Sequence, residues 1–182
     1  MRIISGFLKG KKLFSPPNKT IRPTLDRHRE SIFNILDHAP WAQDLRSKKG
    51  KWRICDLFCG TGALGFEAYS RGGSELYLVD QSIKLCRENA TTLKLETVNI
   101  IRSDVLKVNL DFSQFDLIFI DPPYRLDLVP QKLNMFENYC SKDAIIIVEH
   151  ESNLKYECKQ FKCLKEIKTK RSLIRFLMVD IY

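Results

Sequence analysis

The chain has 182 residues, enough for one domain with a full hydrophobic core and a small extension. Its 44% hydrophobic and 29% charged residues are typical of a globular protein, and no apolar run approaches the roughly 20 residues that a membrane span needs. The six cysteines form no C-x-x-C pair. We therefore expect reduced thiols, a cytoplasmic location, and neither a disulfide framework nor a metal site.

The formal net charge of +8 is concentrated at the two ends of the chain. Residues 1–53 carry a net charge of +9 and residues 155–182 carry +5, whereas residues 54–154 carry −6. A solvated surface accounts for any single lysine. An excess spread over whole segments favours a polyanionic partner instead, most simply a nucleic acid.

The first fifty residues differ in pattern from the rest and are expected to form a basic extension, residues 1–50, ahead of a larger domain, residues 51–182. Glycines at positions 6 and 10 in a loosely alternating run predict a short hairpin. A helix with an apolar stripe is expected to open at Arg22-Pro23-Thr24 and to end near Pro40.

The larger domain alternates strands with helices, which predicts an α/β fold with a parallel sheet. Strands are expected at residues 52–58, 75–79, 98–102, 117–120 and 144–149, with helices at 63–70, 82–95 and 126–139. Residues 161–168 and 172–182 read as two strands with no helix between them, so they are expected to pair antiparallel at the edge of the sheet.

The first strand leads into a glycine-rich loop that spans Asp56 to Gly65. Its pattern Gly60-Thr61-Gly62-x-x-Gly65 matches the dinucleotide fingerprint, in which glycines let the backbone approach a ligand. An acidic residue, Asp80, ends the next strand, where a nicotinamide dehydrogenase would bind a ribose. The loop therefore predicts a nucleotide-like cofactor, without deciding which one.

Two carboxylates favour S-adenosylmethionine over a dinucleotide. Asp56 lies just before the glycines, where it would repel a pyrophosphate but suits a cationic methionine ammonium. Asp104, after Ser103 at the end of the third strand, could accept a hydrogen bond from the adenine amine. The alternatives are that Asp80 only caps the helix that follows and that Asp104 only makes a turn.

A second loop, Asp121-Pro122-Pro123-Tyr124, follows a strand of apolar residues. The prolines fix φ near −65° and remove two N–H donors, which leaves a stiff backbone rich in acceptors. The exocyclic amine of a base is a poor nucleophile, and a carboxylate and a carbonyl that accept its N–H bonds would orient it for methylation. Tyr124 offers a ring for stacking on the base. A simple turn after the strand is the alternative.

Three stretches resemble a known family. They are Arg22-Pro23-Thr24 with Asp26, Arg27, Arg29, Glu30, Phe33, Asn34 and Leu36; Asp56 to Gly65 with Glu67, Ala68 and Ser70-Arg71-Gly72; and Asp121-Pro122-Pro123-Tyr124. Together they resemble the bacterial 16S ribosomal RNA (guanine(966)-N(2))-methyltransferases, the RsmD-like family, over nearly the whole chain. Many amino methyltransferases share the second loop, so the Arg-Pro-Thr helix joined to this glycine loop is the more specific feature.

The resemblance implies a Rossmann-like class I methyltransferase fold, with a seven-stranded, mostly parallel sheet that contains one antiparallel strand. It also implies S-adenosylmethionine as methyl donor and a guanine N2 amine in 16S rRNA of the 30S subunit as target, with a monomer as the expected state. The expected catalytic residues are Asp121, Pro122, Pro123 and Tyr124. The expected cofactor-binding residues are Thr24, Asp56, Phe58, Gly60, Thr61, Gly62, Gly65, Asp80, Gln81, Ser103 and Asp104.

Two further functions stay open on the sequence. A DNA adenine-N6 methyltransferase shares both loops, although it usually carries a larger target-recognition region. A non-catalytic rRNA-binding assembly factor would need the basic ends but neither loop. One departure from the family bears on a turn or an RNA contact: Lys170-Arg171-Ser172 stands where the family usually has a Tyr-Gly pair before its last strand.

Overall fold

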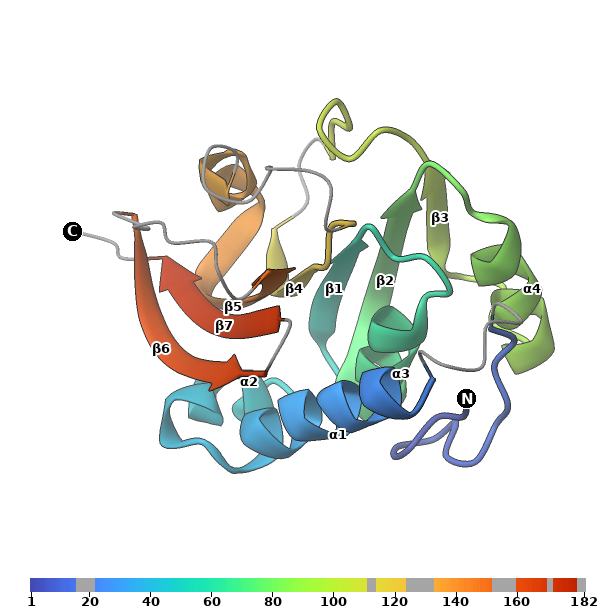
Figure 1. The fold of residues 1–182 in the computed structure, drawn as a ribbon, viewed down its shortest axis with the longest axis horizontal. Helices are drawn as coiled ribbons and strands as arrows, with labels where there is room; N and C mark the ends of the chain where they lie inside the picture. The colour runs from blue at the N-terminus through green and yellow to red at the C-terminus, as the bar shows by residue number, and fades with distance from the viewer. Residues whose placement is uncertain (16–21, 111–113, 124–132, 152–159, 170–171, 180–182) are drawn as a thin grey trace.

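The computed structural model describes residues 1–15, 22–110, 114–123, 133–151, 160–169 and 172–179, and for residues 22–26 and 134 it describes the backbone alone. The elements are α1 (Arg22–His38), η1 (Pro40–Ala42), α2 (Gln43–Ser47), β1 (Trp52–Leu57), α3 (Ala63–Gly72), β2 (Gly73–Asp80), α4 (Lys84–Leu93), β3 (Asn99–Arg102), β4 (Phe115–Ile120), η2 (Leu133–Tyr139), β5 (Cys140–Glu151), β6 (Phe161–Lys168) and β7 (Ser172–Val179) (Figure 1).

The strands form one sheet in the order β3-β2-β1-β4-β5-β7-β6. The pairs from β3 through β5 are parallel, whereas β7 is antiparallel to both β5 and β6. Within the described residues β7 is thus the one strand that runs against the others. The predicted α/β fold with a mostly parallel sheet is confirmed, as is the antiparallel pairing of the last two strands at the edge.

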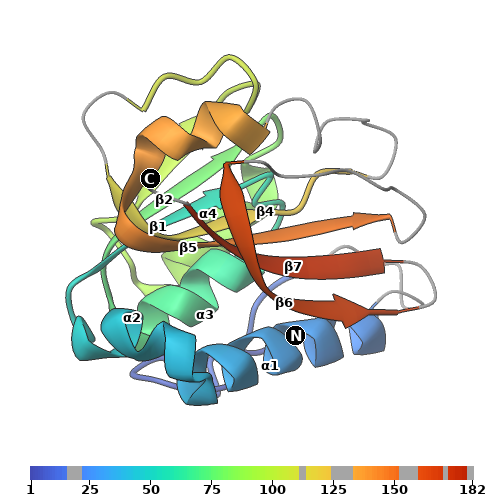
Figure 2. The same cartoon turned by 90° about the vertical axis from the view of Figure 1, so that its left-hand side faces the viewer.

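Helices cover both faces of the sheet. Side chains of α1, α3 and α4 join one buried cluster with the face of β1 and β4 that carries Ile54 and Phe119. The 3₁₀ helix η2 and residues 105–110 join a second cluster against the opposite face. Figure 2 shows this arrangement, with α1, α2 and α3 on one side of the sheet and η2 on the other.

The centre of the sheet is apolar because its strands are enclosed on both faces. Every residue of β4 is buried, and the Phe119 ring lies 6.0 Å from the ring of Phe33 on α1, centroid to centroid. Burying a side chain of this size contributes about 1.5–3 kcal/mol. The contact therefore fixes α1 across the sheet, close to the strand that leads into the second loop.

A buried carboxylate joins three elements at the amino end of β4. Asp116 is 8% exposed and accepts hydrogen bonds from the Arg53 backbone N–H, the Lys48 Nζ and the Ser141 Oγ, each at 3.0 Å. These donors come from the start of β1, the residue after α2, and the start of β5. They compensate the carboxylate, as a buried charge requires.

Residues 1–15, which we call the N-terminal arm, are held against α3. An isolated bridge pairs Arg2 with Lys12, as the predicted hairpin requires. The fully buried Glu67 carboxylate accepts the Ile4 and Ser5 backbone N–H groups at 2.7 and 3.0 Å. Gly6 has a φ of +82°, and a Cβ there would lie 1.8 Å from the Ser70 carbonyl oxygen. The close approach of the arm to α3 therefore requires glycine.

Two expectations about the elements are changed. The helix expected at 126–139 is a 3₁₀ helix over Leu133–Tyr139 within the described residues, and β5 follows it directly at Cys140. Strand β5 begins four residues earlier than expected because its first residues pair beyond the apolar run.

Ile3 and Phe33 share a buried cluster with the sheet, and the proposed boundary near residue 50 stays a prediction. In the described part of the chain, no helix is long and apolar enough to cross a membrane.

Candidate active site

The glycine-rich loop begins where β1 ends and leads into α3 through backbone that favours glycine. Gly60 and Gly62 have φ values of +53° and +77°, and a Cβ on Gly62 would lie 2.5 Å from the Phe66 ring. Phe58 adopts a φ of +61°, which is costly for a residue with a side chain and is often retained at functional sites. A Cβ on Gly60 would meet nothing within 4 Å, so the backbone there faces open space.

Asp56 lies behind this loop and supports it. The carboxylate is 2% exposed, and its Oδ2 accepts the Gly65 backbone N–H at 2.8 Å. Burial raises the pKa of Asp56 to about 7; the Gly65 N–H opposes this shift and the nearby Asp80 charge adds to it. Asp56 is therefore a carboxylate that would be ionised more fully if a cation were bound beside it.

Asp80, at the end of β2, connects the glycine-rich loop to the turn that follows β2. Its Oδ2 accepts the Gly60 N–H at 2.9 Å, and its Oδ1 accepts the Ser82 N–H at 2.8 Å. The carboxylate thus ends a strand and caps the turn before α4, which is the role that the alternative interpretation of Asp80 predicted. Each oxygen of an ionised carboxylate can accept more than one hydrogen bond, so these contacts leave acceptor capacity for a ligand.

The end of β3 lies beside the end of β2. The Ser103 N–H donates to the Asp80 carbonyl at 3.0 Å, and the exposed Gln81 accepts Arg102 Nε at its carbonyl, 3.2 Å away. Asp104 Oδ1 accepts the Leu106 N–H at 3.0 Å, so this side chain does make the turn that the alternative expected. These predicted residues follow strands that are neighbours in the sheet.

The second loop lies directly beside the first because β1 and β4 are neighbours. Leu57 pairs with Ile120, and the Asp121 N–H reaches the Leu57 carbonyl at 3.5 Å. Burial, and then the charges of Glu149 and Asp56, hold the pKa of Asp121 well above its usual range. Pro122 is buried and Pro123 is exposed. Tyr124 lies outside the described residues, as does the Thr24 side chain.

Glu149, whose charge acts on Asp121, and its partner His28 were not predicted. Glu149 on β5 is 8% exposed, and its Oε1 lies 3.5 Å from the Nδ1 of His28 on α1. The sequence gives one signal for Glu149, an acidic residue at the end of a strongly apolar strand. It gives none for His28, because the contact depends on how α1 crosses the sheet.

A third residue that sequence reasoning missed connects the N-terminal arm to the glycine-rich loop. Asn89 on α4 is fully buried; its Oδ1 accepts the Phe14 N–H at 2.6 Å, and its Nδ2 donates to the carbonyls of Phe14 and Thr61 at 3.1 and 2.9 Å. A polar residue on the helix stripe formed by Cys86, Ala90 and Leu93 is the signal that could have found it.

The arrangement combines an open backbone loop with carboxylates at the ends of neighbouring strands. Open α/β sheets bind ligands outside these carboxyl ends. Asp56, Asp80 and Asp121 bring three carboxyl groups together. Burial and mutual repulsion raise the pKa of Asp56 and Asp121, so a positively charged ligand would be favoured here and a pyrophosphate disfavoured. Within the residues that the structure describes, no group of three or more His, Cys, Asp or Glu could hold a metal ion.

Comparisons with known proteins agree with the resemblance predicted from the sequence. A family model described as "Conserved hypothetical protein 95" matches residues 1–179. The chain is 34% identical over 157 residues to ribosomal RNA small subunit methyltransferase D of Escherichia coli K12, covering 83% of this chain and 75% of that protein. It is 33% identical over 161 residues to the putative rRNA methyltransferase YlbH of Bacillus subtilis, covering 83% of each.

The fold comparison gives the same relationship. The structure of the putative methyltransferase yhhF from Escherichia coli is similar to this one with a TM-score of 0.82 at 26% identity, covering 100% of this chain and 99% of that chain. The family model, the curated relatives and the structure thus match over most of the chain. The chain belongs to the Conserved hypothetical protein 95 family, the family of the ribosomal RNA small subunit methyltransferase D proteins.

Proposed function

We propose that this protein transfers a methyl group from S-adenosylmethionine to the exocyclic N2 amine of a guanine in 16S rRNA of the small ribosomal subunit. The observation that carries the proposal is the pairing of Leu57 with Ile120, which puts the glycine-rich loop and Asp121 side by side at the carboxyl ends of β1 and β4. A methyl donor and an amine acceptor need such adjacent sites, because the reacting atoms must be held about 3–3.5 Å apart.

The residues of the glycine-rich loop fit S-adenosylmethionine. The open space at Gly60 gives room for a ligand on the backbone, and Asp80 and Asp104 are carboxylates with capacity for hydroxyl and amine donors. Asp56 would lie behind the methionine ammonium. Phe58, Thr61, Gly62, Gly65, Gln81, Ser103 and Thr24 complete the proposed binding set. When bound, S-adenosylmethionine supplies an electrophilic sulfonium methyl group.

Asp121 acts on the acceptor. Its carboxylate accepts a hydrogen bond from the guanine N2 amine, and the Pro122 carbonyl accepts the other, so that the nitrogen lone pair points at the methyl group. Pro123 stiffens the loop and Tyr124 stacks on the base, which is worth about 1–3 kcal/mol. Positioning supplies most of the rate enhancement, since well-oriented reactants gain up to about 7–11 kcal/mol.

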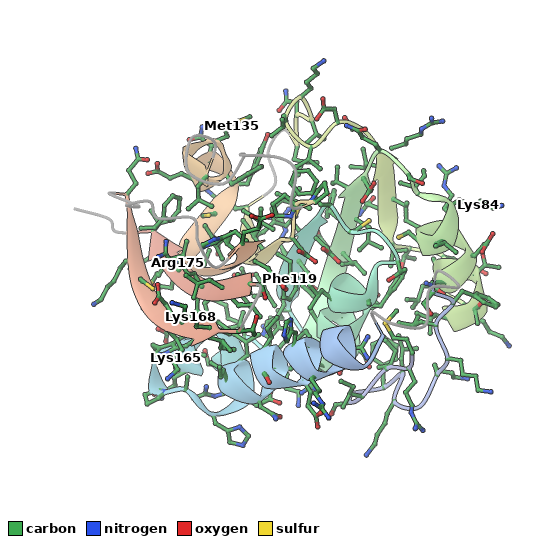
Figure 3. All side chains as sticks on the ribbon, in the orientation of Figure 1. Lys84, Phe119, Met135, Lys165, Lys168 and Arg175 are labelled. Atoms are coloured by element: carbon green, nitrogen blue, oxygen red, sulfur yellow. The ribbon has the colours of Figure 1, made fainter. Side chains whose placement is uncertain are left out.

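The basic ends of the chain are proposed to hold the rRNA. Lys9, Lys11 and Lys12 are exposed on the N-terminal arm. Lys165 and Lys168 are exposed on the edge strand β6, at the opposite side of the molecule from the arm (Figures 1 and 3). Phosphate contacts from both sides would orient a folded RNA over the acidic site between them.

The name of the curated relative supports rRNA over DNA as the substrate. A DNA adenine-N6 methyltransferase would share Asp121 and the glycine-rich loop, so these two features alone do not separate the two substrates. A non-catalytic assembly factor would have no need for strained backbone at Phe58 or for carboxylates at three strand ends. Both alternatives are outcomes of the experiment below.

The test is transfer of a radiolabelled methyl group from S-adenosylmethionine to three substrates: 30S particles, naked 16S rRNA and duplex DNA. The modified nucleoside is then identified by mass spectrometry. We expect N2-methylguanosine from one of the rRNA substrates. Label in DNA alone would contradict the rRNA proposal, and binding to rRNA without any transfer would indicate an assembly factor.

Asp121→Asn is the matched variant for this assay, because it keeps the size of the side chain and removes its charge. We expect it to lower kcat by at least 100-fold, within the 10²–10⁴-fold range of a positioned proton acceptor. The Asp44→Asn variant, at an exposed position on α2, is the control and should methylate at the wild-type rate. Wild-type turnover by Asp121→Asn would remove this residue from the mechanism.

A further inference from the structure

Asp121 directly follows β4, and Glu149 lies beside it in register on the neighbouring strand β5, on the same face of the sheet. Ile120 of β4 pairs with Val148 of β5 in parallel register. The residues that follow this pair along the two chains are Asp121 and Glu149. Neighbouring strands lie about 4.8 Å apart. The two carboxylates therefore stand side by side. Asp121 is the first residue of the loop that is proposed to hold the amine, and Glu149 is on the neighbouring strand β5.

Helix α1 contacts Glu149 through His28. The His28 Nδ1 lies 3.5 Å from the Glu149 Oε1, and the two side chains are 16% and 10% exposed. The contact is an ion pair whenever the imidazole is protonated. Phe33, further along α1, packs on Phe119 of β4, so the helix that carries His28 is fixed on the same strand that presents Asp121. His28 is thus held at a defined position relative to both acids.

We propose that Glu149 is a second acid of the amine-methylation site, which shares with Asp121 the proton released by the amine, and that His28 holds Glu149 in place. This inference rests on the proposed function. It deepens it by naming how the site accepts a proton, and it concerns residues that no motif of the sequence singled out.

The proton must go somewhere for the reaction to balance. Methyl transfer forms the N–C bond and breaks the S–C bond, whose electron pair stays on sulfur. The guanine nitrogen is left with one proton too many, and Asp121 accepts it. Two neighbouring carboxylates hold one shared proton better than a lone carboxylate does, because protonation also removes their mutual repulsion. The raised pKa of Asp121 agrees with this pairing.

Several charged groups surround the pair. From β1, Asp56 adds a further negative charge near Asp121. From α1, His28 faces Glu149, and on β5 itself His150 follows it on the opposite face. From β7, Arg175 neighbours the residue that pairs with Glu149. Of these, the carboxylates raise the proton affinity of Asp121, and a protonated His28 would offset the charge of Glu149.

The first test measures the titration of Asp121 in the free protein by ¹³C NMR with labelled aspartate side chains, assigned with Asp121→Asn. Glu149→Gln removes the neighbouring negative charge, so we expect the Asp121 pKa to fall by about one unit or more. Glu151→Gln, two residues along the same strand, is the matched control and should leave the titration unchanged. An Asp121 titration that Glu149→Gln does not move overturns the inference.

The second test is the pH profile of methyl transfer. Because Asp121 must be ionised to accept the proton, its protonation sets the acidic limb of kcat. Glu149→Gln should move that limb to lower pH and lower the plateau about threefold to tenfold, because a carboxylate with a lower pKa is a weaker base. Glu151→Gln should match the wild type. An unchanged limb, or a higher KM for RNA with kcat unchanged, counts against a role in proton transfer.

His28 is tested by a pair of variants. His28→Leu keeps a comparable size without a donor and should lower kcat at least threefold with the KM for RNA unchanged, whereas His28→Gln keeps an N–H donor and should recover most of the loss. Full activity of His28→Leu would remove His28 from the proposal. The NMR titration needs no substrate, so a wild-type protein that fails to methylate rRNA overturns the proposed function while the pairing of Glu149 with Asp121 is still decided separately.

Discussion

The Asn89 side-chain amide donates a hydrogen bond to the Thr61 carbonyl, 2.9 Å away, and so fastens helix α4 to the glycine-rich loop. The same amide binds the backbone of Phe14 through two hydrogen bonds. One buried residue thereby links the last described part of the N-terminal arm to the proposed donor site. The position of the arm and the shape of the loop are therefore coupled.

Asn89→Ala is expected to damage both structures at once. The substitution leaves the Phe14 N–H and two carbonyls without their partner, which should lower the free energy of unfolding by about 2–4 kcal/mol. It should also weaken S-adenosylmethionine binding about tenfold, because the loop loses a support. Urea denaturation and calorimetry measure the two effects, with Thr92→Ala, at an exposed position on the same helix, as control. Unchanged donor affinity would show that the loop is independent of the arm.

Binding of the donor should depend on pH through Asp56. Its pKa of about 7 in the free protein means that the carboxylate is roughly half protonated at neutral pH. A bound ammonium favours the ionised form, so binding at pH 7 should release up to about half a proton per molecule, and affinity should rise up to about tenfold from pH 6 to pH 8. Calorimetry in two buffers with different ionisation enthalpies measures the released proton. Asp56→Asn should release none.

The Glu67 carboxylate should be essential for the docking of the arm. It accepts the N–H groups of Ile4 and Ser5 and pairs with Arg71 Nε at 2.8 Å, and it is fully buried. Glu67→Ala leaves two buried N–H groups and the Arg71 Nε without their acceptor, although Arg71 keeps its pair with Asp37, so the substitution should cost about 3–5 kcal/mol. Glu67→Gln should cost less. Hydrogen exchange at Ile4 and Ser5 reports the docking directly, and slow exchange in Glu67→Ala would contradict this assignment.

The arm should contribute to RNA affinity mainly through charge. The double variant Lys11→Gln/Lys12→Gln removes two exposed cations from it. For every lysine that no longer neutralises a phosphate, the slope of log K against log salt should become shallower by about 0.7–0.9. Filter binding of 16S rRNA at several salt concentrations measures the slope. Lys94→Gln/Lys142→Gln removes two exposed lysines from the acidic middle segment and is the control. Equal slopes for both double variants would place the RNA elsewhere.

The sequence was most informative where the structure is local. The glycine fingerprint and the apolar strands predicted where the two loops lie, because backbone conformation and burial follow from neighbouring residues. Contacts between distant residues were not predictable in this way. The His28–Glu149 pair joins residues 28 and 149, and Asn89 meets Phe14 and Thr61, so each depends on the packing of helices against the sheet.

The carboxylates of the site show the same division. Their positions at strand ends could be predicted from the alternation of strands and helices. The sequence allowed the capping contact of Asp80 and the turn at Asp104 only as alternatives to ligand binding, because both roles demand the same residue at the same place. The apolar side chains of η2 recur every third residue, at Leu133, Phe136 and Tyr139, which suits a 3₁₀ helix; over one short segment the same i, i+3 spacing also fits the α-helix that was expected.

An acidic residue lies near each end of strand β4, Asp116 at its amino end and Asp121 just after its carboxyl end, and their surroundings differ. Asp116 is compensated by three donors, whereas Asp121 stands beside other carboxylates. Side chains alternate between the faces of a strand, so a slip of β4 by one residue would turn Asp121 away from Glu149 and pull Asp116 from its donors. The contacts of Asp116 at the amino end of β4 therefore fix the register of the strand, and this register sets the position of Asp121 at its other end.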